Sequence, residues 1–302
     1  MRNDTLTRRS VMAGGAGIAL AAPLPAMAAA TRMSAAALLS SGTLPAGAAS
    51  TLASATLIHG SGDTQVTGIM VATMPSLVVL RQAVASGCNL ILSAEAPLYS
   101  RPLPADANPM ARAGAERLFA QPVFREKSAF IAGHKLVVYR LPTRSEAPGP
   151  SADNPLFTGH LARAMGLSTT ADGWIFDTAP ITLGTLVQRA QSAVGAHGGL
   201  RMIGDPAMPV RKVCVVPGTT EMAATLPRLR QADVLVAGDL REWELVPYIA
   251  DSHAAGHPKG LVALGRILSQ QPGTRALAAA LKAAHPGLPV SFAPHADPFW
   301  RA

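Results

Sequence analysis

The sequence predicts an α/β protein whose helices pack on buried mixed sheets, and two observations favour this fold class. Short apolar runs of strand length alternate with helical patterns along most of the chain. The runs at 90–92, 234–237 and 261–264 are apolar at every position rather than at alternate positions. Continuous apolar strands of this kind are typical of sheets that are covered by helices on both faces.

Each element follows from its own local pattern. Helices are expected where apolar residues recur three and four positions apart, and Ser76 and Gly87 are suited to begin and end the first of them. The predicted helices are 76–87, 123–132, 183–194, 220–230, 242–255 and 274–284. The predicted strands are 90–92, 135–141, 200–204, 210–216, 234–237, 261–264 and 290–292. Residues 31–56 predict an initial helix followed by a loosely specified connection.

Proline-rich stretches suggest how the chain is divided. Residues 142–155 contain four prolines together with Gly, Ser and Asp, which predicts a linker or surface loop. This loop separates a first lobe at 31–141 from a second lobe at 156–302. A second proline-rich loop is predicted at 101–109.

The amino-terminal residues have the pattern of an export leader. Arg8 and Arg9 precede a weakly apolar stretch from 13 to 24, and Ala26 and Ala28 are the small residues that a signal peptidase reads. We therefore expect a twin-arginine signal peptide at 1–28 and a periplasmic or otherwise exported protein. The apolar stretch is shorter than the roughly 20 residues of a spanning helix, and no later run reaches that length. Because this route carries folded proteins, often with a cofactor, the leader directs attention to a possible cofactor site.

Composition argues against nucleic acid as a partner and does not decide whether the two cysteines form a disulfide. The chain carries a formal charge of +8, but aromatic residues make up only 4% and are not interleaved with arginine clusters. Nucleic-acid binding is therefore not expected. Cys88 and Cys214 lie in or beside apolar runs, so we expect two buried thiols, although an exported protein could also pair them.

Several segments, in order and spacing, resemble one known family. They are TGIM at 67–70, LRQAVASGCNLILSAEAPLY at 80–99, DVLVAGD at 233–239, EWE at 242–244 and LGRILSQ at 264–270. They are similar to the Nif-three-like family, also called GTP cyclohydrolase 1 type 2 homologues or dinuclear-metal-centre hexameric proteins. The strand at 136–141 and the terminal DPFW at 297–300 fit the longer branch of that family.

The resemblance implies a two-lobed α/β subunit, a ring-like homo-hexamer and two divalent metals held between the lobes. A metal pair can acidify a bridging water and hold a reacting oxygen from both sides. The family supplies its metal ligands from three segments. The first is Ser-His-His-Pro or His-Glu-Pro after the first long strand, the second contains a histidine after the next strand, and the third is a late Gly-His-x-x-Ser-Glu.

This sequence departs from the family pattern at all three segments. Ala94 stands where the first segment has a histidine, which leaves Glu95. The second segment, which begins at Pro142, contains no histidine, and Glu146 is its nearest carboxylate. The third segment has Arg266 and Gln270 in place of the family's histidine and glutamate. Arginine has no acceptor atom, so it cannot coordinate a cation.

We expect no metal cofactor as a result, and Glu95 and Glu146 are the ligands if one binds. A charge in a cleft is costly unless it is partnered, so Arg266 is expected to pair with Glu95 or Glu146. The alternatives are that Arg266 presents its fork to a small anionic ligand, or that it points to solvent. The candidate cleft residues are Glu95, Glu146, Asp239, Glu242, Glu244, Arg266 and Gln270.

Other ionisable residues receive structural interpretations. Glu242 and Glu244 flank Trp243 and are read either as cleft residues or as caps and solvated side chains of a helix start. His253 and His257 have helical spacing, but the following Gly and Pro favour helix-end histidines over a metal pair. The remaining candidates, which we read as surface or structural histidines, are His160 and His295.

Three functions are compatible with these patterns. The leading hypothesis is an exported Nif-three-like protein with an eroded metal site, acting as a non-catalytic oligomeric scaffold or as a small-anion-binding protein. The alternative is a metal-dependent hydrolase of the GTP cyclohydrolase 1 type 2 kind that uses a reduced carboxylate site. Its residues would be Glu95, Glu146, Asp239 and Glu242, which without imidazole favour Mg²⁺, Ca²⁺ or Mn²⁺. A purely structural envelope protein is the third reading.

Overall fold

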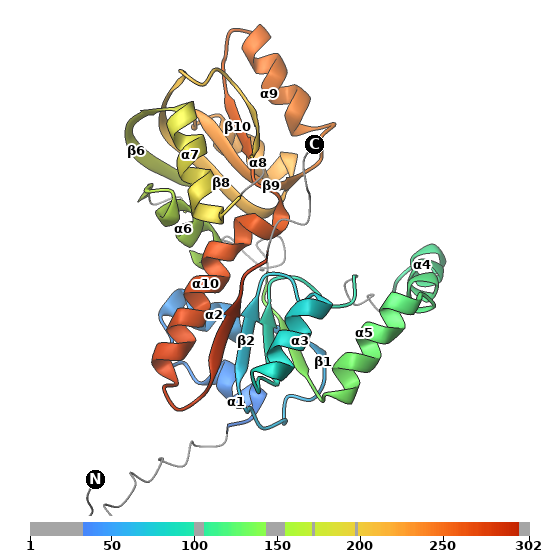
Figure 1. The fold of residues 1–302 in the computed structure, drawn as a ribbon. Coiled ribbons are helices and arrows are strands. Elements are labelled where there is room, and N and C mark those ends of the chain that lie inside the picture. The colour runs from blue at the N-terminus through green and yellow to red at the C-terminus, as the bar shows by residue number, and fades with distance from the viewer. Residues whose placement is uncertain (1–32, 100–105, 143–154, 171–172, 197–198, 296–302) are drawn as a thin grey trace, which may run out of the picture. The chain divides into compact units, whose positions relative to one another are not determined.

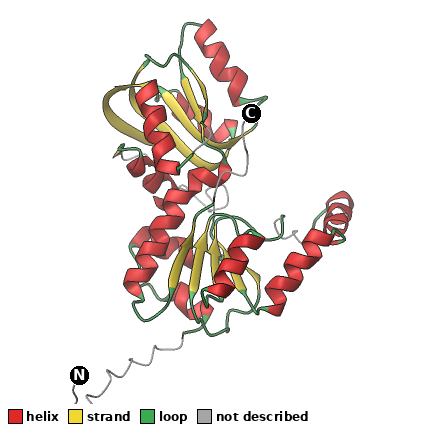
Figure 2. Ribbon diagram, viewed as in Figure 1, coloured by secondary structure: helices red, strands yellow, loops and turns green. Residues whose placement is uncertain are grey.

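The computed structural model describes residues 33–99, 106–142, 155–170, 173–196 and 199–295. In these residues the chain forms two sheets with helices against them (Figures 1 and 2). The predicted leader at 1–28, Glu146 and the segment at 297–300 lie outside the described residues. Within the described residues, no helix is both long enough and apolar enough to cross a membrane.

The first sheet has the strand order β1-β4-β3-β2-β11. Its strands are β1 (Thr56–His59), β2 (Ile69–Ala72), β3 (Leu90–Ser93), β4 (Val137–Arg140) and β11 (Val290–Ala293). The strands β4, β3, β2 and β11 run parallel, and β1 is an antiparallel edge strand. The last described strand, β11, therefore completes a sheet that begins near residue 56.

Helices cover both faces of this sheet, as the fully apolar strands predict. On one face Leu90 and Leu92 pack with residues of α1 (Ala35–Ser40), α2 (Ala46–Ala53) and the carboxyl-terminal part of α10 (Arg266–Ala284). On the other face Ile91 packs with residues of α3 (Leu77–Ala85) and α5 (Pro122–Gly133). The helix α4 (Pro109–Phe119) precedes α5 and has no buried residue in the described structure.

The second sheet has the strand order β5-β6-β8-β9-β10-β7 and is also mixed. Its strands are β5 (Ser168–Thr169), β6 (Ile175–Thr182), β7 (Arg201–Ile203), β8 (Pro209–Thr220), β9 (Val234–Leu240) and β10 (Gly260–Ala263). The central strands β8, β9 and β10 are parallel, and the outer pairs are antiparallel. One face is covered by α6 (Pro155–Ala164) and α7 (Leu183–Val194), and the other by α8 (Met222–Leu229) and α9 (Leu245–Ala254).

Two helices, α6 and α10, contribute to both hydrophobic cores. Leu156 of α6 and Leu277 of α10 belong to the core of the first sheet. Leu161 of α6 and Leu268 of α10 belong to the core of the second sheet. The two helices pack against each other at Gly273, where an added side chain would lie 2.7 Å from the carbonyl oxygen of Leu156. The two cores therefore share one pair of helices.

The predicted fold class is confirmed, with local corrections. Residues 31–56 hold two helices, α1 and α2, rather than one, and the predicted helix at 242–255 begins only at Leu245. The helix predicted at 274–284 begins at Arg266, because α10 continues through Pro272. The strands β1, β2, β5 and β6 and the helices α4 and α6 were not predicted.

Candidate functional site at the start of helix α10

A charged cluster lies at the first residue of α10. The Nε of Arg266 donates to Oε1 of Glu95 at 2.6 Å, and its Nη1 donates to the hydroxyl of Thr219 at 2.6 Å. The same Nη1 lies 3.7 Å from Oδ2 of Asp239. These four residues are called the Arg266 cluster below. The sequence predicted that Arg266 pairs with Glu95 or Glu146, and the structure shows the pair with Glu95.

The first sheet positions Glu95. This residue follows β3 by two positions, and its backbone N–H donates to the carbonyl of Thr73 at 3.0 Å. The hydroxyl of Ser93 donates to the Glu95 carbonyl at 2.9 Å, which closes the turn. Because β2 and β3 are parallel, Glu95 lies at the carboxyl edge of the sheet, the edge where α/β proteins commonly bind ligands.

The second sheet positions Thr219 and Asp239 through a bulge. The register between β8 and β9 shifts between Val216 and Thr219, and Gly218 has the left-handed φ of +72°. A side chain at Gly238 would collide with the backbone of Gly218, so the two strands and α10 approach closely there. Bulges of this kind redirect side chains and are frequent next to functional sites. This bulge presents Thr219 to Arg266.

Gln270 lies one helical turn after Arg266 and is 1% exposed. A side chain added at Gly218 would lie 2.7 Å from Nε2 of Gln270, so the amide packs against the bulge. Its Oε1 is buried and has no hydrogen-bond partner among the described residues. A buried acceptor without a partner is uncommon, because leaving it unsatisfied costs about 1–3 kcal/mol.

The Arg266–Glu95 pair is partly withdrawn from solvent. The side chains of Arg266 and Glu95 are 26% and 14% exposed, whereas Asp239 is 53% exposed. Removing one partner of such a pair leaves the other charge poorly solvated, and this is more costly than losing an exposed ion pair. With two carboxylates around one guanidinium, the charge of Arg266 is offset inside the cluster.

Two predicted cleft residues form other ion pairs. The carboxylate of Glu242 accepts from Arg201 at 2.6 Å, with both side chains more than 60% exposed. Glu244 accepts from Arg241 at 3.1 Å and occupies the residue before α9 without a capping side-chain hydrogen bond. Neither contact is to Arg266.

The remaining sequence candidates are dispersed. Ala94 is fully buried beside Glu95, and Pro142 follows β4. His253 shares a hydrogen bond of 2.7 Å with the backbone carbonyl of Lys259, and α9 ends at Ala254, before His257. In the described ranges, no three His, Cys, Asp or Glu side chains are grouped so that they could hold a metal ion.

Sequence reasoning missed Thr219, Gly218 and Ser269. The hydroxyl of Ser269 accepts from the N–H of Gly218 at 3.0 Å and donates to the carbonyl of Arg266 at 2.8 Å, so it ties the bulge to the helix. A Pro-Gly pair inside an apolar strand pattern is a bulge signal, and residues 217–218 carry it. That signal could have located Thr219.

A buried lysine also escaped the sequence analysis. Lys127 of α5 is 1% exposed, and its Nζ has no hydrogen-bond partner among the described residues. The Nζ lies 4.7 Å from the ring centroid of Tyr99, which has a left-handed φ of +63°. Burial lowers the pKa of Lys127 from 10.5 to about 8, because the charged ammonium loses hydration.

The cysteines behave as expected for two buried thiols. Cys88 and Cys214 are buried and lie in different cores, one against each sheet. Burial raises the pKa of the Cys88 thiol, and a hydrogen bond with Ser291 opposes part of that effect. A disulfide between them is absent from the described structure.

Together these features define a class of protein: two mixed α/β sheets that share a pair of helices, with a polar cluster where the shared α10 begins. Residues 93–293 match the model of the DUF34/NIF3 (NGG1p interacting factor 3) family. The chain belongs to the DUF34/NIF3 family, which confirms the predicted recognition.

Several solved structures share the fold of this chain. The chain is similar to the Staphylococcus aureus hypothetical protein SA1388, with a TM-score of 0.62, 15% identity, and coverage of 90% of this chain and 100% of that one. It is similar to a Bacillus cereus protein related to NIF3, with a TM-score of 0.61, 14% identity, and coverage of 88% and 97%. It is also similar to reduced HcgD from Methanocaldococcus jannaschii, with a TM-score of 0.54, 14% identity, and coverage of 86% and 98%. A comparison with curated proteins gives no match.

Proposed function

We propose that this chain is an exported DUF34/NIF3 protein that works without the family's metal pair, as a non-catalytic oligomeric scaffold. The observation that carries the proposal is the bond of 2.6 Å between Nε of Arg266 and Oε1 of Glu95. Arg266 stands at a position where the family resemblance implies a metal ligand, and Glu95 is the carboxylate left in the first ligand segment. A fixed cation therefore engages the carboxylate that a metal would need.

The described residues around Arg266 do not fit a dinuclear metal centre. Such centres use several imidazole and carboxylate ligands around two cations. Here Glu95 is engaged by Arg266, Glu242 by Arg201, and Asp239 lies 3.7 Å from Nη1 of Arg266. A divalent ion at this position would also be repelled by the guanidinium. The carboxylate-site hydrolase is thus the less supported alternative, and no catalytic step is assigned to these residues.

The cluster also disfavours the small-anion reading at this position. An incoming anion would have to replace Glu95 or Thr219 at the guanidinium and would approach two carboxylates. Charge pairs that are already satisfied give an added anion little net gain. A scaffold role is therefore better supported than anion binding at the Arg266 cluster.

A restoration series tests the proposal. The mature wild-type protein and the triple variant Ala94→His, Arg266→His, Gln270→Glu would be purified without chelator and analysed for Zn, Fe, Mn and Mg by mass spectrometry. We expect no stoichiometric metal in the wild type and uptake of metal in the triple variant. Arg241→His, which places a histidine on an exposed residue, is the matched control, and circular dichroism checks folding of each variant.

About two bound metal ions per wild-type chain would overturn the proposal, since the family chemistry needs a pair. A triple variant that folds and binds no metal would contradict the claim that these positions alone removed the site. Conversely, uptake by the Arg241→His control would indicate adventitious histidine binding.

The oligomeric part of the proposal is supported by apolar exposure on α4 and at the start of α5. Met110, Phe119 and Val123 are 81%, 46% and 59% exposed, and α4 buries no residue in the described structure. Apolar side chains grouped on a helix pair are typical of contact surfaces. The proposed occupant is a second copy of this chain, in keeping with the homo-oligomer that the family resemblance implies.

Light scattering coupled to size exclusion measures this directly. We expect an assembly larger than a monomer for the wild type, and a smaller mass for Met110→Glu and Phe119→Glu, because a buried carboxylate is costly at an interface. Val78→Glu, at a residue 62% exposed on α3, is the control and should keep the wild-type mass. A monomeric wild type would refute the oligomer.

Export is proposed on the leader pattern alone. Replacement of both Arg8 and Arg9 by Lys should leave the full-length protein in the cytoplasmic fraction, because the paired arginines are what the twin-arginine route reads. Fractionation with an antibody to the chain measures this. Unchanged export of the double variant would contradict the assignment.

A further inference from the structure

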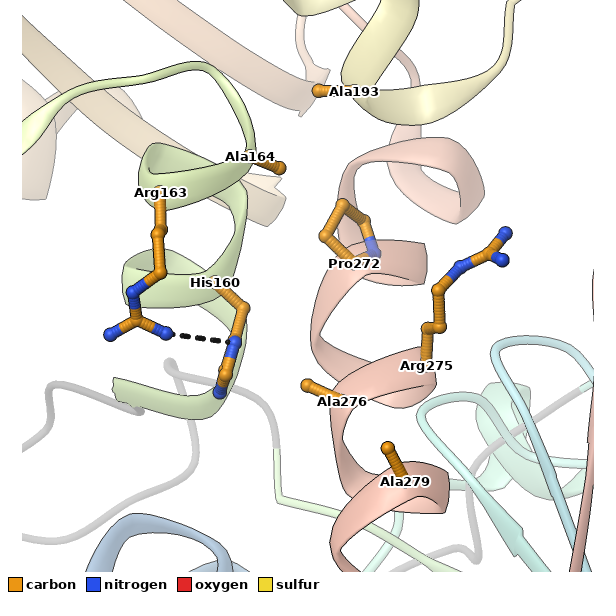
Figure 3. A pocket seen from close by; sticks show the side chains of 8 residues that line it. All are labelled: His160, Arg163, Ala164, Ala193, Pro272, Arg275, Ala276 and Ala279. Atoms are coloured by element: carbon orange, nitrogen blue, oxygen red, sulfur yellow. Dashed lines mark hydrogen bonds between the residues drawn. The ribbon is translucent and has the colours of Figure 1, made fainter.

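A hollow of about 400 Å³ lies between α6 and α10, and none of its lining residues belongs to the Arg266 cluster (Figure 3). His160 and Arg163 line it from α6, and Arg275 lines it from α10. Figure 3 shows the two arginines on opposite sides of the hollow. Its volume falls within the range of small-ligand sites, which is about 300–1,000 Å³.

The floor of the hollow is apolar and made of small side chains. Pro272 and Ala276 of α10 face Ala164 of α6 across it, and Ala279 extends it by one turn of α10 (Figure 3). Small side chains leave room for a ligand to contact both helices at once. Apolar walls with a few placed polar groups are the usual composition of a binding site for an organic molecule.

Two arginines that line the hollow have no carboxylate partner among the described residues. In the part of the chain that the structure describes, neither Arg163 nor Arg275 forms an ion pair with a carboxylate. By contrast, Arg201, Arg241 and Arg266 all do so. Two guanidinium groups that form no ion pair with a described carboxylate therefore border one hollow, and their bidentate geometry suits a carboxylate.

Both arginines are held by neighbouring side chains. Nη1 of Arg163 lies 3.1 Å from Nδ1 of His160, and because arginine only donates, Nδ1 must be the acceptor. The imidazole is then neutral and carries its proton on Nε2, which is a second donor at the hollow. Arg275 lies 4.9 Å from the ring centroid of Phe292, a cation–π contact that orients the guanidinium.

We propose that this α6–α10 hollow binds an aliphatic organic acid. A carboxylate would accept from Arg163 and from Nε2–H of His160, a second carboxylate would accept from Arg275, and the hydrocarbon between them would lie on the alanine and proline floor. An α,ω-dicarboxylate satisfies both walls and the apolar floor with one molecule. A bare inorganic anion would leave the floor uncovered and would reach only one wall.

Isothermal titration of the mature protein with a series of α,ω-dicarboxylates from succinate to sebacate tests the proposal. We expect saturable binding with one preferred chain length, because the two arginines are fixed on opposite walls. Arg163→Ala and Arg275→Ala should each weaken binding of the preferred acid about tenfold or more, the loss typical of one charge-assisted contact. Ala279→Leu keeps both charges but fills the hollow, and it should weaken binding similarly.

Arg81→Ala is the matched control, since Arg81 is an exposed arginine on α3, away from the hollow. It should leave the affinity unchanged. Equal weakening by Arg81→Ala would mean that the dicarboxylates respond only to net charge, and this result would overturn the proposal. So would inorganic phosphate that binds as tightly as the preferred acid.

Two further outcomes point to a macromolecular occupant instead. Binding of a poly-glutamate peptide without binding of any dicarboxylate would assign the hollow to an acidic protein partner and refute the small-acid proposal. A change in mass by light scattering for Arg163→Ala and Arg275→Ala, again without dicarboxylate binding, would assign it to a contact between copies of the chain.

Discussion

Replacing Lys127 by methionine should stabilise the fold near neutral pH. Burial lowers the pKa of Lys127 from 10.5 to about 8, so the native state disfavours the ammonium that the unfolded chain carries freely. At about 1.4 kcal/mol for each pKa unit, the difference between these two pKa values lowers the free energy of unfolding by about 3 kcal/mol below pH 8. Methionine keeps the length of the stem and needs no hydrogen bond.

The net gain is smaller than this because Lys127 also has a favourable contact. Its Nζ lies 4.7 Å from the Tyr99 ring centroid, and a cation–π contact of this kind contributes roughly 1 kcal/mol. We therefore expect Lys127→Met to raise the free energy of unfolding by about 2 kcal/mol at pH 7. The sign follows from linkage: between about pH 8 and 10.5 the unfolded state binds more protons, so wild-type stability rises with pH in that window.

Urea unfolding of the wild type and Lys127→Met at pH 7 and at pH 10 measures this difference. The advantage of the variant should shrink or vanish at the higher pH, where the wild-type amine is neutral in the fold. Lys282→Met, at an exposed lysine in the last turn of α10, is the control and should show little change at either pH. A variant less stable than the wild type at pH 7, or a difference independent of pH, would refute the reasoning.

Other substitutions and titrations follow from the same structure. Gly238→Ala should destabilise the protein by roughly 2–4 kcal/mol, because the new methyl group meets the backbone of Gly218; a melting temperature close to wild type would contradict this close approach. A thiol reagent should leave both Cys88 and Cys214 unmodified in the native protein and modify both after unfolding in guanidinium; rapid native labelling of either would show that it is not buried. Burial and the nearby Arg163 lower the pKa of His160, so its ring should titrate below 6.5 by nuclear magnetic resonance. The stability that comes from keeping this imidazole neutral should be lost as the pH falls below 6.5. A pKa at or above 6.5 would argue against the tautomer in which Nδ1 accepts from Arg163.

The parts of the fold that could be predicted are those whose signal is local. A continuous apolar run such as 90–92 and a capped helix such as α3, with Ser76 accepting from the N–H of Val79, carry their structure in a few neighbouring residues. By contrast, β6 has only two buried residues and its pairing with β8 is irregular, so it lacks the alternation that marks a strand. The early start of α10 was missed because proline usually ends helices, whereas Pro272 lies inside this one.

Only the ion pair of the candidate site could be predicted from the sequence, because a charge in a cleft needs a partner of opposite charge. A cleft arginine needs a partner, and this requirement limited the predicted partners of Arg266 to Glu95 or Glu146, of which Glu95 forms the pair in the structure. Thr219 could not be selected in the same way, because its position depends on the bulge at Gly218. The ion pairs of Glu242 and Glu244 depend on Arg201 and Arg241, whose proximity is a property of the tertiary fold.

The pairing of β11 with β2 has a consequence for the order in which the protein can be made. Val290 to Ala293 leave the ribosome well after Arg140, yet they form the edge of a sheet whose other strands end by Arg140. Until then β2 presents an open edge, and open edges pair readily with other chains. A nascent chain must therefore be shielded, or kept dilute, while the residues between β4 and β11 are made, and a chain truncated before α10 would lack the helix that both cores share.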